Sequence, residues 1–314
     1  MSIVPEDAQL GTVVVSVDAE LGWGFHDLTS PPARRVESAR SGWIRLLDLF
    51  DTYDLPATWA IVGHLFLTDC DGEHVGHPTP AGWFERELGA WSDRPDLRFG
   101  NGLIERVENA SVDHELANHS FSHVLFGAAS TSSTMARAEV TATERAAGRS
   151  FDTFVFPRNY VGHRQVLADT GVTSYRGRTT TMSGGSLATS AGKLSRAVAG
   201  SGAPLVDPVV DEYGLVNVPA SMYLFDFEGL PRAATEFVAD DPVVTRACRG
   251  VDAASRTGRT LHLWLHPNNI IDDRHHRRLE RILEYIATKR DNGSVSVDPM
   301  GTVASRVLDE RVEQ

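Results

Sequence analysis

Lysine is almost absent from this chain of 314 residues, and cysteine and long apolar runs are scarce as well. The two lysines are Lys193 and Lys289, so arginine carries nearly all of the positive charge. Lys and Arg together number 30 against 42 Asp and Glu, which gives a net charge of −12. Binding to nucleic acid depends on an excess of basic surface. We therefore expect no nucleic-acid partner.

The two cysteines, Cys70 and Cys248, lie far apart and form neither a disulfide framework nor a CxxC metal pair. We interpret both as free thiols. No apolar run approaches the roughly 20 residues that span a bilayer, so we expect no membrane span. The first ten residues lack the basic region and apolar stretch of a secretory signal, which predicts a cytoplasmic protein. The sequence does not indicate an oligomeric state.

Short β-branched runs alternate along the chain with segments of helical periodicity, which predicts an α/β fold with a parallel sheet. We expect one domain over residues 1–314, with a long inserted connection at about 69–99. A connection of that length in a compact domain is usually functional or forms a lid. The strands are expected at 12–17, 57–63, 151–156, 215–218, 260–265 and 294–297, and the clearest helices at 37–53, 243–256 and 272–289.

The densest chemical signal is the pair His119 and His123 in the segment HELANHSFSH. Histidines at i and i+4 share one side of a helical turn, which suits two imidazole ligands on one metal ion. An isolated HxxxH is more often a helix start with partly exposed histidines. The metal hypothesis therefore depends on further residues elsewhere in the chain.

Carboxylates stand at the end of the first predicted strand, in the segment Val17-Asp18-Ala19-Glu20. Residues i and i+2 of an extended chain point to the same face, so Asp18 and Glu20 are predicted to project together. The carboxyl ends of parallel strands are where α/β proteins place their sites. One carboxylate could complete a metal shell and the other could serve as general base.

Two more strand ends carry reactive side chains. His266 follows the strand at 260–265 and is a candidate general acid. His262 lies within that strand, and we interpret it as a hydrogen-bonded core histidine. Arg158 follows the strand at 151–156 beside a proline, where it could hold a carboxylate or bind substrate.

The order of these motifs resembles the polysaccharide deacetylases, the NodB-homology domain of carbohydrate esterase family 4. The segments that carry the resemblance are SVDAE, ATWAIVGHL, HELANHSFSH, FVFPRNYVG and LHLWLHP, and together they cover about residues 11–304. The resemblance implies a distorted (β/α) barrel of about seven parallel strands.

The resemblance also implies roles for individual residues. It makes Asp18 the catalytic base and His266 the general acid. His119 and His123 become metal ligands. Arg158 matches the arginine that positions the base, and Tyr160 matches the residue whose backbone amide helps to bind the oxyanion. Asn159 and Trp23 are further candidates for contact with the substrate or the oxyanion.

Two departures from the family pattern concern the metal. Ala19 stands where the family has the second of two adjacent aspartates, so Glu20, or else Asp18, would be the third metal ligand. The third motif reads FPRNY instead of an arginine-first form. The expected cofactor is a divalent metal ion, with zinc first and cobalt, nickel or manganese as alternatives.

The sequence thus predicts a metal-dependent hydrolase that removes an N-acetyl group from an amino sugar, either an intracellular glycan precursor or a short saccharide. Two alternatives stay open. Relatives on this fold also hydrolyse other non-peptide C–N bonds, such as those of a ureide or a cyclic imide. The loss of an aspartate at Ala19 is also compatible with an inactive protein that only binds sugar.

Overall fold

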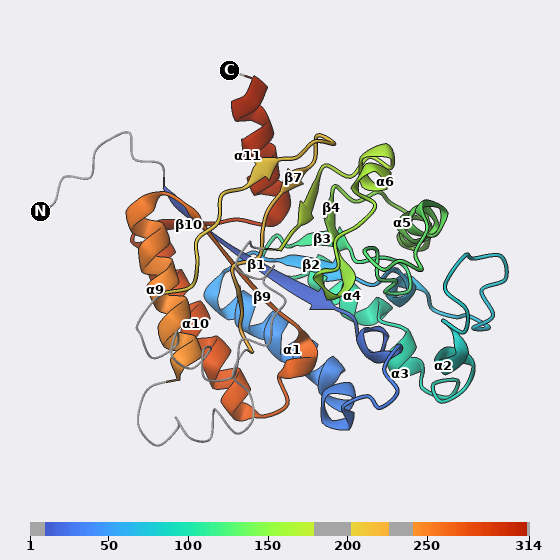
Figure 1. Cartoon of the computed structure of the whole chain (residues 1–314). Helices are drawn as coiled ribbons and strands as arrows, with labels where there is room; N and C mark the ends of the chain where they lie inside the picture. Colours follow the sequence, from blue (N-terminus) through green and yellow to red (C-terminus); the bar gives the residue numbers. More distant parts are fainter. Residues whose placement is uncertain (1–9, 179–201, 226–240, 313–314) are drawn as a thin grey trace, which may run out of the picture.

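The computed structural model describes residues 10–178, 202–225 and 241–312, in which strands and helices alternate along the chain (Figure 1). The strands are β1 Gly11–Ala19, β2 Thr58–Ile61, β3 Glu115–Asn118, β4 Thr153–Val155, β5 Ser174–Arg176, β6 Val209–Val210, β7 Val216–Asn217, β8 Met222–Tyr223, β9 Thr260–Leu265 and β10 Val295–Val297. The helices are α1 Ala33–Tyr53, α2 Glu85–Leu88, α3 Pro95–Arg98, α4 Asn101–Glu108, α5 Ser133–Ala147, α6 Arg164–Asp169, α9 Pro242–Thr257, α10 Asp273–Asp291 and α11 Met300–Val312. Short 3-10 turns are η1 Trp23–Phe25, η2 Gly63–Phe66, η3 Pro157–Asn159 and η5 Pro267–Asn269.

All of these strands belong to one curled sheet, in the order β6-β7-β5-β4-β3-β2-β1-β9-β8, with β10 paired to the start of β1. The β6–β7 pair is antiparallel, and the other named strand pairs are parallel. The sheet forms a half-barrel, which confirms the predicted distorted (β/α) barrel. The carboxyl ends of the parallel strands lie along one common edge of the sheet.

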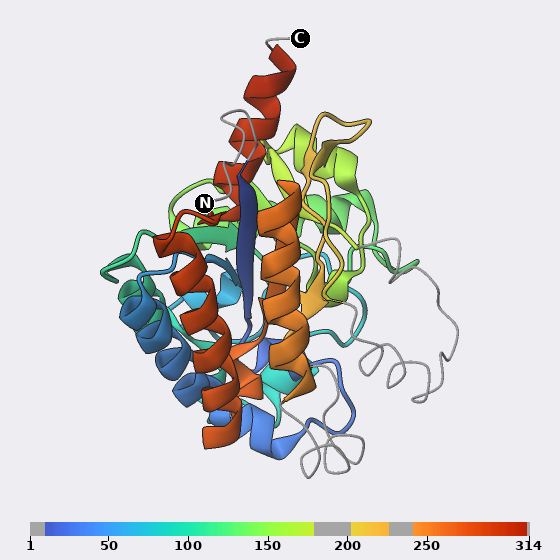
Figure 2. The same cartoon turned by 90° about the vertical axis from the view of Figure 1, so that its left-hand side faces the viewer.

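Strand β1 is buried on both faces, as expected for a strand within a parallel sheet. Val13, Val15 and Val17 belong to the large apolar cluster that α1, α9 and α10 contribute to. Val14 faces the other way and belongs to a second cluster with Met300 of α11. Figure 2 shows α9 and α10 running along β1, with α11 near the amino-terminal end of that strand. β-Branched residues suit such a position because they pack well on a pleated surface.

The two later helices, α9 and α10, lie within one or two residues of their predicted bounds. The carboxylate of Asp241 accepts a hydrogen bond from the amide of Val243 at 2.9 Å, and Gly258 ends α9 in the left-handed conformation at φ 70°. Asp272 caps α10 in the same way. Helix α1 begins at Ala33, four residues before the predicted start at Glu37.

The connection over residues 69–99 is packed onto the rest of the molecule through two short helices, α2 and α3. Glu87, Trp91 and Arg98 of this connection are buried. None of the helices in the described residues is long and apolar enough to cross a membrane.

Candidate active site

The carboxyl-end edge of the sheet collects side chains from three neighbouring strands. β1 pairs with β2 and β9, and β2 pairs with β3, so the ends of β1, β9 and β3 lie close together. Asp18 is the penultimate residue of β1 and Glu20 follows it, while His119 and His266 directly follow β3 and β9. The i, i+2 spacing does bring Asp18 and Glu20 to one side, because both carboxylates face His266.

Glu20 lies between two histidines. Its Oε1 is 3.3 Å from Nε2 of His119 and 3.1 Å from Nε2 of His123. The three side chains are buried and converge well enough to hold a metal ion. A carboxylate with two imidazoles is a ligand set that zinc accepts. Of the two carboxylates left open by the sequence, Glu20 is therefore the one that lies with this histidine pair.

The segment that carries these histidines is a loop, and the predicted helical turn is wrong. The amide of His119 donates to the carbonyl of Ile61 on β2, and Ser120 and His123 adopt left-handed backbone angles of φ 62° and 63°. These two residues curl the chain back on itself, so that the imidazoles meet at Glu20. A spacing of four residues therefore gives the expected convergence by a different local route.

The tautomer of His119 supports a cation in this cluster. Its Nδ1 lies 2.7 Å from the carbonyl oxygen of Val155, and this contact requires Nδ1 to donate a proton. Nε2 of a neutral His119 then has only a lone pair, which faces the Glu20 carboxylate. Two acceptors at that distance need a proton or a metal ion between them. Nε2 of His123 faces the same carboxylate oxygen at 3.1 Å.

Gly24 makes room for the Glu20 carboxylate. A Cβ atom built on Gly24 would overlap with Oε2 of Glu20. Burial raises the pKa of Glu20, but attraction to His266 and His123 outweighs it and holds the pKa well below its ordinary value. The carboxylate is thus charged and available as a ligand.

Asp18 is held by Arg176, the last residue of β5. The guanidinium donates two hydrogen bonds to the carboxylate, at 2.6 and 2.7 Å, and both side chains are buried. Nε2 of His266 lies 3.6 Å from Oδ2 of Asp18. Burial raises the pKa of Asp18, but charge attraction from Arg176 and then from His266 outweighs it, so the pKa lies below its usual value.

Behind Asp18 the network continues to His262. Nη1 of Arg176 donates to Oγ of Ser16 at 3.0 Å, and that hydroxyl lies 2.8 Å from Nε2 of His262. His262 is fully buried and also bonds to the carbonyl of Val218 through Nδ1. The interpretation of His262 as a hydrogen-bonded core histidine is confirmed.

Arg158 does not hold Asp18, which corrects the expectation drawn from the sequence. Its guanidinium pairs with Asp27 at 2.5 Å and contacts the carbonyl of Gly24, at the rim of the site. Arg158 has a left-handed backbone angle (φ 52°) in the turn η3, which lies at the rim of the site. The sequence missed Arg176, because its strand is only three residues long and shows no periodic pattern.

The three residues proposed for oxyanion or substrate contact separate in the structure. The amide of Tyr160 donates to the carbonyl of Pro157 at 3.0 Å, so it is not free to bind an oxyanion. Trp23 is buried and donates its indole N–H to the carbonyl of Arg98, which makes it a packing residue. Asn159 does reach the site, where its Oδ1 accepts a hydrogen bond from Nε of Arg176 at 3.1 Å.

A cavity of about 280 Å³ opens over Asp18, Glu20 and His266. Its volume lies at the small end of ligand pockets. The described residues that line it are Asp18, Glu20, Gly24, Phe25, Leu28, Pro32, Arg35, His123, Arg158, Asn159, Tyr223, Trp264 and His266.

Comparison with known proteins gives structural matches alone. No family model and no curated sequence matches the chain. A structure assigned as a polysaccharide deacetylase from Mycobacterium smegmatis superposes with a TM-score of 0.60 at 17% identity, covering 98% of this chain and 94% of that one. Puue allantoinase gives 0.59 at 12% identity, with 96% and 91% covered.

A third structure, assigned as a polysaccharide deacetylase from Pseudomonas aeruginosa PAO1, gives a TM-score of 0.55 at 13% identity, with 96% and 92% covered. These matches extend over nearly the whole of this chain. The chain therefore has the fold of the polysaccharide deacetylases, and the resemblance carried by its motifs is confirmed at the level of the fold.

Proposed function

We propose that this protein is a metal-dependent hydrolase that removes an N-acetyl group from an amino sugar. The observation that carries the proposal is the convergence of Glu20, His119 and His123 beside an ionised, arginine-held Asp18, at the base of a small cavity. Three protein side chains would bind the ion, and its remaining coordination position would face the cavity. This is the arrangement of a catalytic metal site.

Each residue of the site has a defined task in this reaction. A divalent ion, with zinc first, would be held by Glu20, His119 and His123, and when bound it polarises the acetyl carbonyl and acidifies water. Asp18 accepts the proton of the attacking water, because Arg176 keeps its carboxylate charged and oriented. His266 faces the same space and donates a proton to the leaving amine.

The cavity and the charge of the chain favour a small substrate. About 280 Å³ accommodates a single sugar unit better than several units of a polymer. The aromatic rings of Tyr223 and Trp264 line it, with centroids 4.4 Å apart, and offer an apolar wall to a sugar ring. The net charge of −12 gives little general attraction for polyanionic chains. These features support a short saccharide or a small glycan precursor as the substrate.

A second candidate reaction is the hydrolysis of a ureide or cyclic imide. It is favoured by the likeness to Puue allantoinase, whose TM-score of 0.59 is close to that of the deacetylase match. Parallel assays of acetate release from acetamido sugars and of ring opening or ammonia release from ureides separate the two reactions.

The test of the proposed function uses Asp18→Asn, His266→Ala and Glu20→Gln. Asp18→Asn and His266→Ala are each expected to lower the rate about 10²–10⁴-fold while the protein keeps its metal, because each removes one proton-transfer group. Glu20→Gln is expected to lose both metal affinity and activity. Asp48→Asn, on the exposed face of α1, is the matched control and should leave both unchanged.

Wild-type rates in Asp18→Asn and His266→Ala would contradict the assignment of base and acid. Full activity after exhaustive chelation would contradict the metal. A wild-type protein that binds saccharides but hydrolyses none of the amides tested would favour the inactive sugar-binding alternative.

A further inference from the structure

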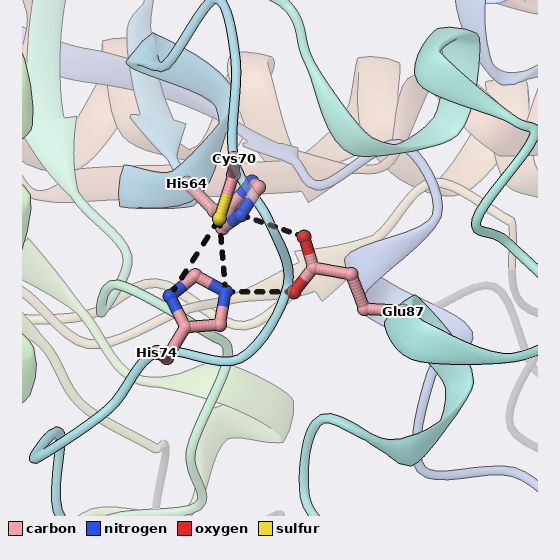
Figure 3. Close-up of side chains that lie close together, drawn as sticks. All are labelled: His64, Cys70, His74 and Glu87. Atoms are coloured by element: carbon pink, nitrogen blue, oxygen red, sulfur yellow. Dashed lines mark hydrogen bonds and ion pairs between the residues drawn. The ribbon is translucent and has the colours of Figure 1, made fainter.

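A second cluster of metal-ligating side chains lies away from the proposed catalytic residues, where the connection over residues 69–99 packs against the end of β2. Figure 3 shows His64, Cys70, His74 and Glu87 turned toward a common point. His64 belongs to η2, Glu87 to α2, and Cys70 and His74 to the irregular segment between them. One ligand atom from each residue lies within 4.8 Å of all the others.

The ligand atoms of the cluster lie slightly closer together than those of a tetrahedral metal site. Nε2 of His74 is 2.7 Å from Oε2 of Glu87 and 3.5 Å from Sγ of Cys70, and Nε2 of His64 is 2.9 Å from Oε1 of Glu87. Ligand atoms at about 2.0–2.3 Å from a central zinc ion lie roughly 3.3–3.8 Å apart. Small outward movements of these side chains would admit an ion.

The surroundings hold the ligand atoms in the form that a metal requires. Nδ1 of His64 donates to the carbonyl of Arg98 at 3.0 Å, which leaves Nε2 with its lone pair facing the cluster. This Nε2 is buried and makes no well-directed hydrogen bond to any described residue. Arg98 also donates to Oε1 of Glu87 through Nε and Nη2, at 3.0 and 2.7 Å, while Oε2 faces Nε2 of His74 at 2.7 Å.

The backbone of the segment is shaped to bring sulfur and imidazole together. Gly72 and His74 have left-handed φ angles of 80° and 47°, and they fold the chain so that Cys70 meets His74 four residues later. The amide of Gly72 donates to Sγ of Cys70 at 3.3 Å and orients the sulfur beside the His74 ring.

Three of the four side chains are secluded from water, and Cys70 is half-buried. The side chains of His64, His74 and Glu87 are 0%, 8% and 1% exposed. The guanidinium of Arg98 forms a salt bridge with the Glu87 carboxylate at 2.7 Å inside this cluster. A buried carboxylate with two imidazoles and a thiol is a donor set for a divalent ion, and four protein ligands leave no open position for a substrate.

We propose that His64, Cys70, His74 and Glu87 form a second, structural metal site suited to zinc, which fastens the 69–99 connection to the end of β2. The connection in turn touches the active-site loops. Nε1 of Trp83 donates to the carbonyl of Ser122, next to His123, at 3.0 Å. The second site would therefore stabilise the loop that carries His123 without taking part in the reaction.

Cobalt substitution tests the proposal without relying on activity. Cobalt bound to a thiolate gives an intense sulfur-to-metal charge-transfer absorption in the near ultraviolet, whereas Glu20, His119 and His123 contain no sulfur. The wild-type protein loaded with cobalt is expected to show this band. Cys248 is the only other cysteine in the chain, so Cys248→Ser is the matched control and should keep the band.

Two further variants separate the two sites. Cys70→Ser is expected to lose the band and about one metal ion per chain, while His119→Ala is expected to keep the band and lose the other ion. Far-ultraviolet circular dichroism shows whether each variant is folded.

Absence of the band in cobalt-loaded Cys248→Ser would overturn the proposal, and this result does not depend on whether Cys70→Ser folds. A metal content in folded Cys70→Ser equal to that of the wild type would overturn it as well. Neither outcome bears on the proposed deacetylase site, which is tested through Glu20 and Asp18.

Discussion

At the scale of single residues, two arginines near the site have distinct surroundings. Arg176 is fully buried and donates to both oxygens of Asp18, whereas Arg158 is partly exposed and pairs with Asp27 at the cavity rim. A bidentate guanidinium fixes both the charge and the direction of a carboxylate, and an ammonium group cannot reproduce that geometry. We infer that Arg176 positions the base and that Arg158 acts at most on the substrate.

This difference predicts a contrast between Arg176→Lys and Arg158→Lys. Arg176→Lys should lower kcat about 10²-fold, because Asp18 loses its fixed direction. The pKa of Asp18 should rise as its bidentate cation weakens, so the acid limb of kcat/KM should move to higher pH. Arg158→Lys should change mainly KM and leave the acid limb in place. The measurement is a pH–rate profile of both variants; identical acid limbs in Arg176→Lys and the wild type would contradict the role of Arg176.

The sequence could predict the residues whose signal is local. Asp18 and Glu20 follow from alternation at a strand end, and His266 from a strand that stops abruptly at Pro267. Arg176 could not be predicted, because its contact with Asp18 joins residues 158 positions apart in the chain. The second metal-ligating cluster had a weak local signal in the spacing of Cys70 and His74. Glu87 and His64 reach this cluster only through tertiary packing.

At the scale of elements, the short segments after the strands determine how the ligands meet. The pattern HxxxH is equally compatible with a helical turn and with a loop containing left-handed residues, and the structure has the loop. The turn η1 matters in the same way, because it brings Gly24 against the Glu20 carboxylate. The positions of these loops depend on close packing against neighbouring backbone, which no periodicity in the sequence reveals.

Gly24→Ala tests this close contact. The added methyl group would overlap with the Glu20 carboxylate and displace it, so metal affinity should fall about 10-fold or more while the fold persists. Isothermal titration with zinc measures the affinity, with Cys70→Ser as background to remove binding at the second site. Gly102→Ala in α4 is the matched control, because a Cβ there meets nothing within 4 Å.

The control should keep wild-type affinity and gain about 0.5–1 kcal/mol in unfolding free energy, since alanine is the better helix former. If Gly24→Ala binds zinc as tightly as Gly102→Ala does, then Glu20 does not depend on the space that Gly24 leaves.

At the scale of the whole molecule, the strand–helix alternation and the resemblance were sufficient for the fold class, because two-sided burial of β-branched strands has a strong sequence signal. The strand β9 was predicted with its observed bounds. The strands β3, β5, β6 and β8 were missed, because two to four residues carry little pattern to distinguish them from a loop. Folding of the chain around this sheet also buries histidines that would titrate freely in the unfolded chain.

These buried histidines make stability depend on pH. Burial lowers the pKa of His262 to about 3 and those of His26 and His114 to about 4. All three are neutral in both states well above pH 6.5, so their contribution to stability is complete there. As the pH falls below about 6.5, the unfolded chain takes up protons at these positions while the folded chain does not, and the folded state loses stability.

His262→Gln isolates one of these contributions. Glutamine does not titrate, so between about pH 6 and pH 4.5 the variant's unfolding free energy should fall less steeply than that of the wild type, by about 1.4 kcal/mol per pH unit. The variant should be less stable at pH 7.5, because the hydrogen bonds to Ser16 and Val218 are weakened, and the two curves should converge as the pH drops. Urea unfolding in the presence of a chelator gives both curves without a contribution from metal release. Parallel curves over this range would mean that His262 is protonated in the folded protein as readily as in the unfolded chain, which its complete burial between Ser16 and Val218 argues against.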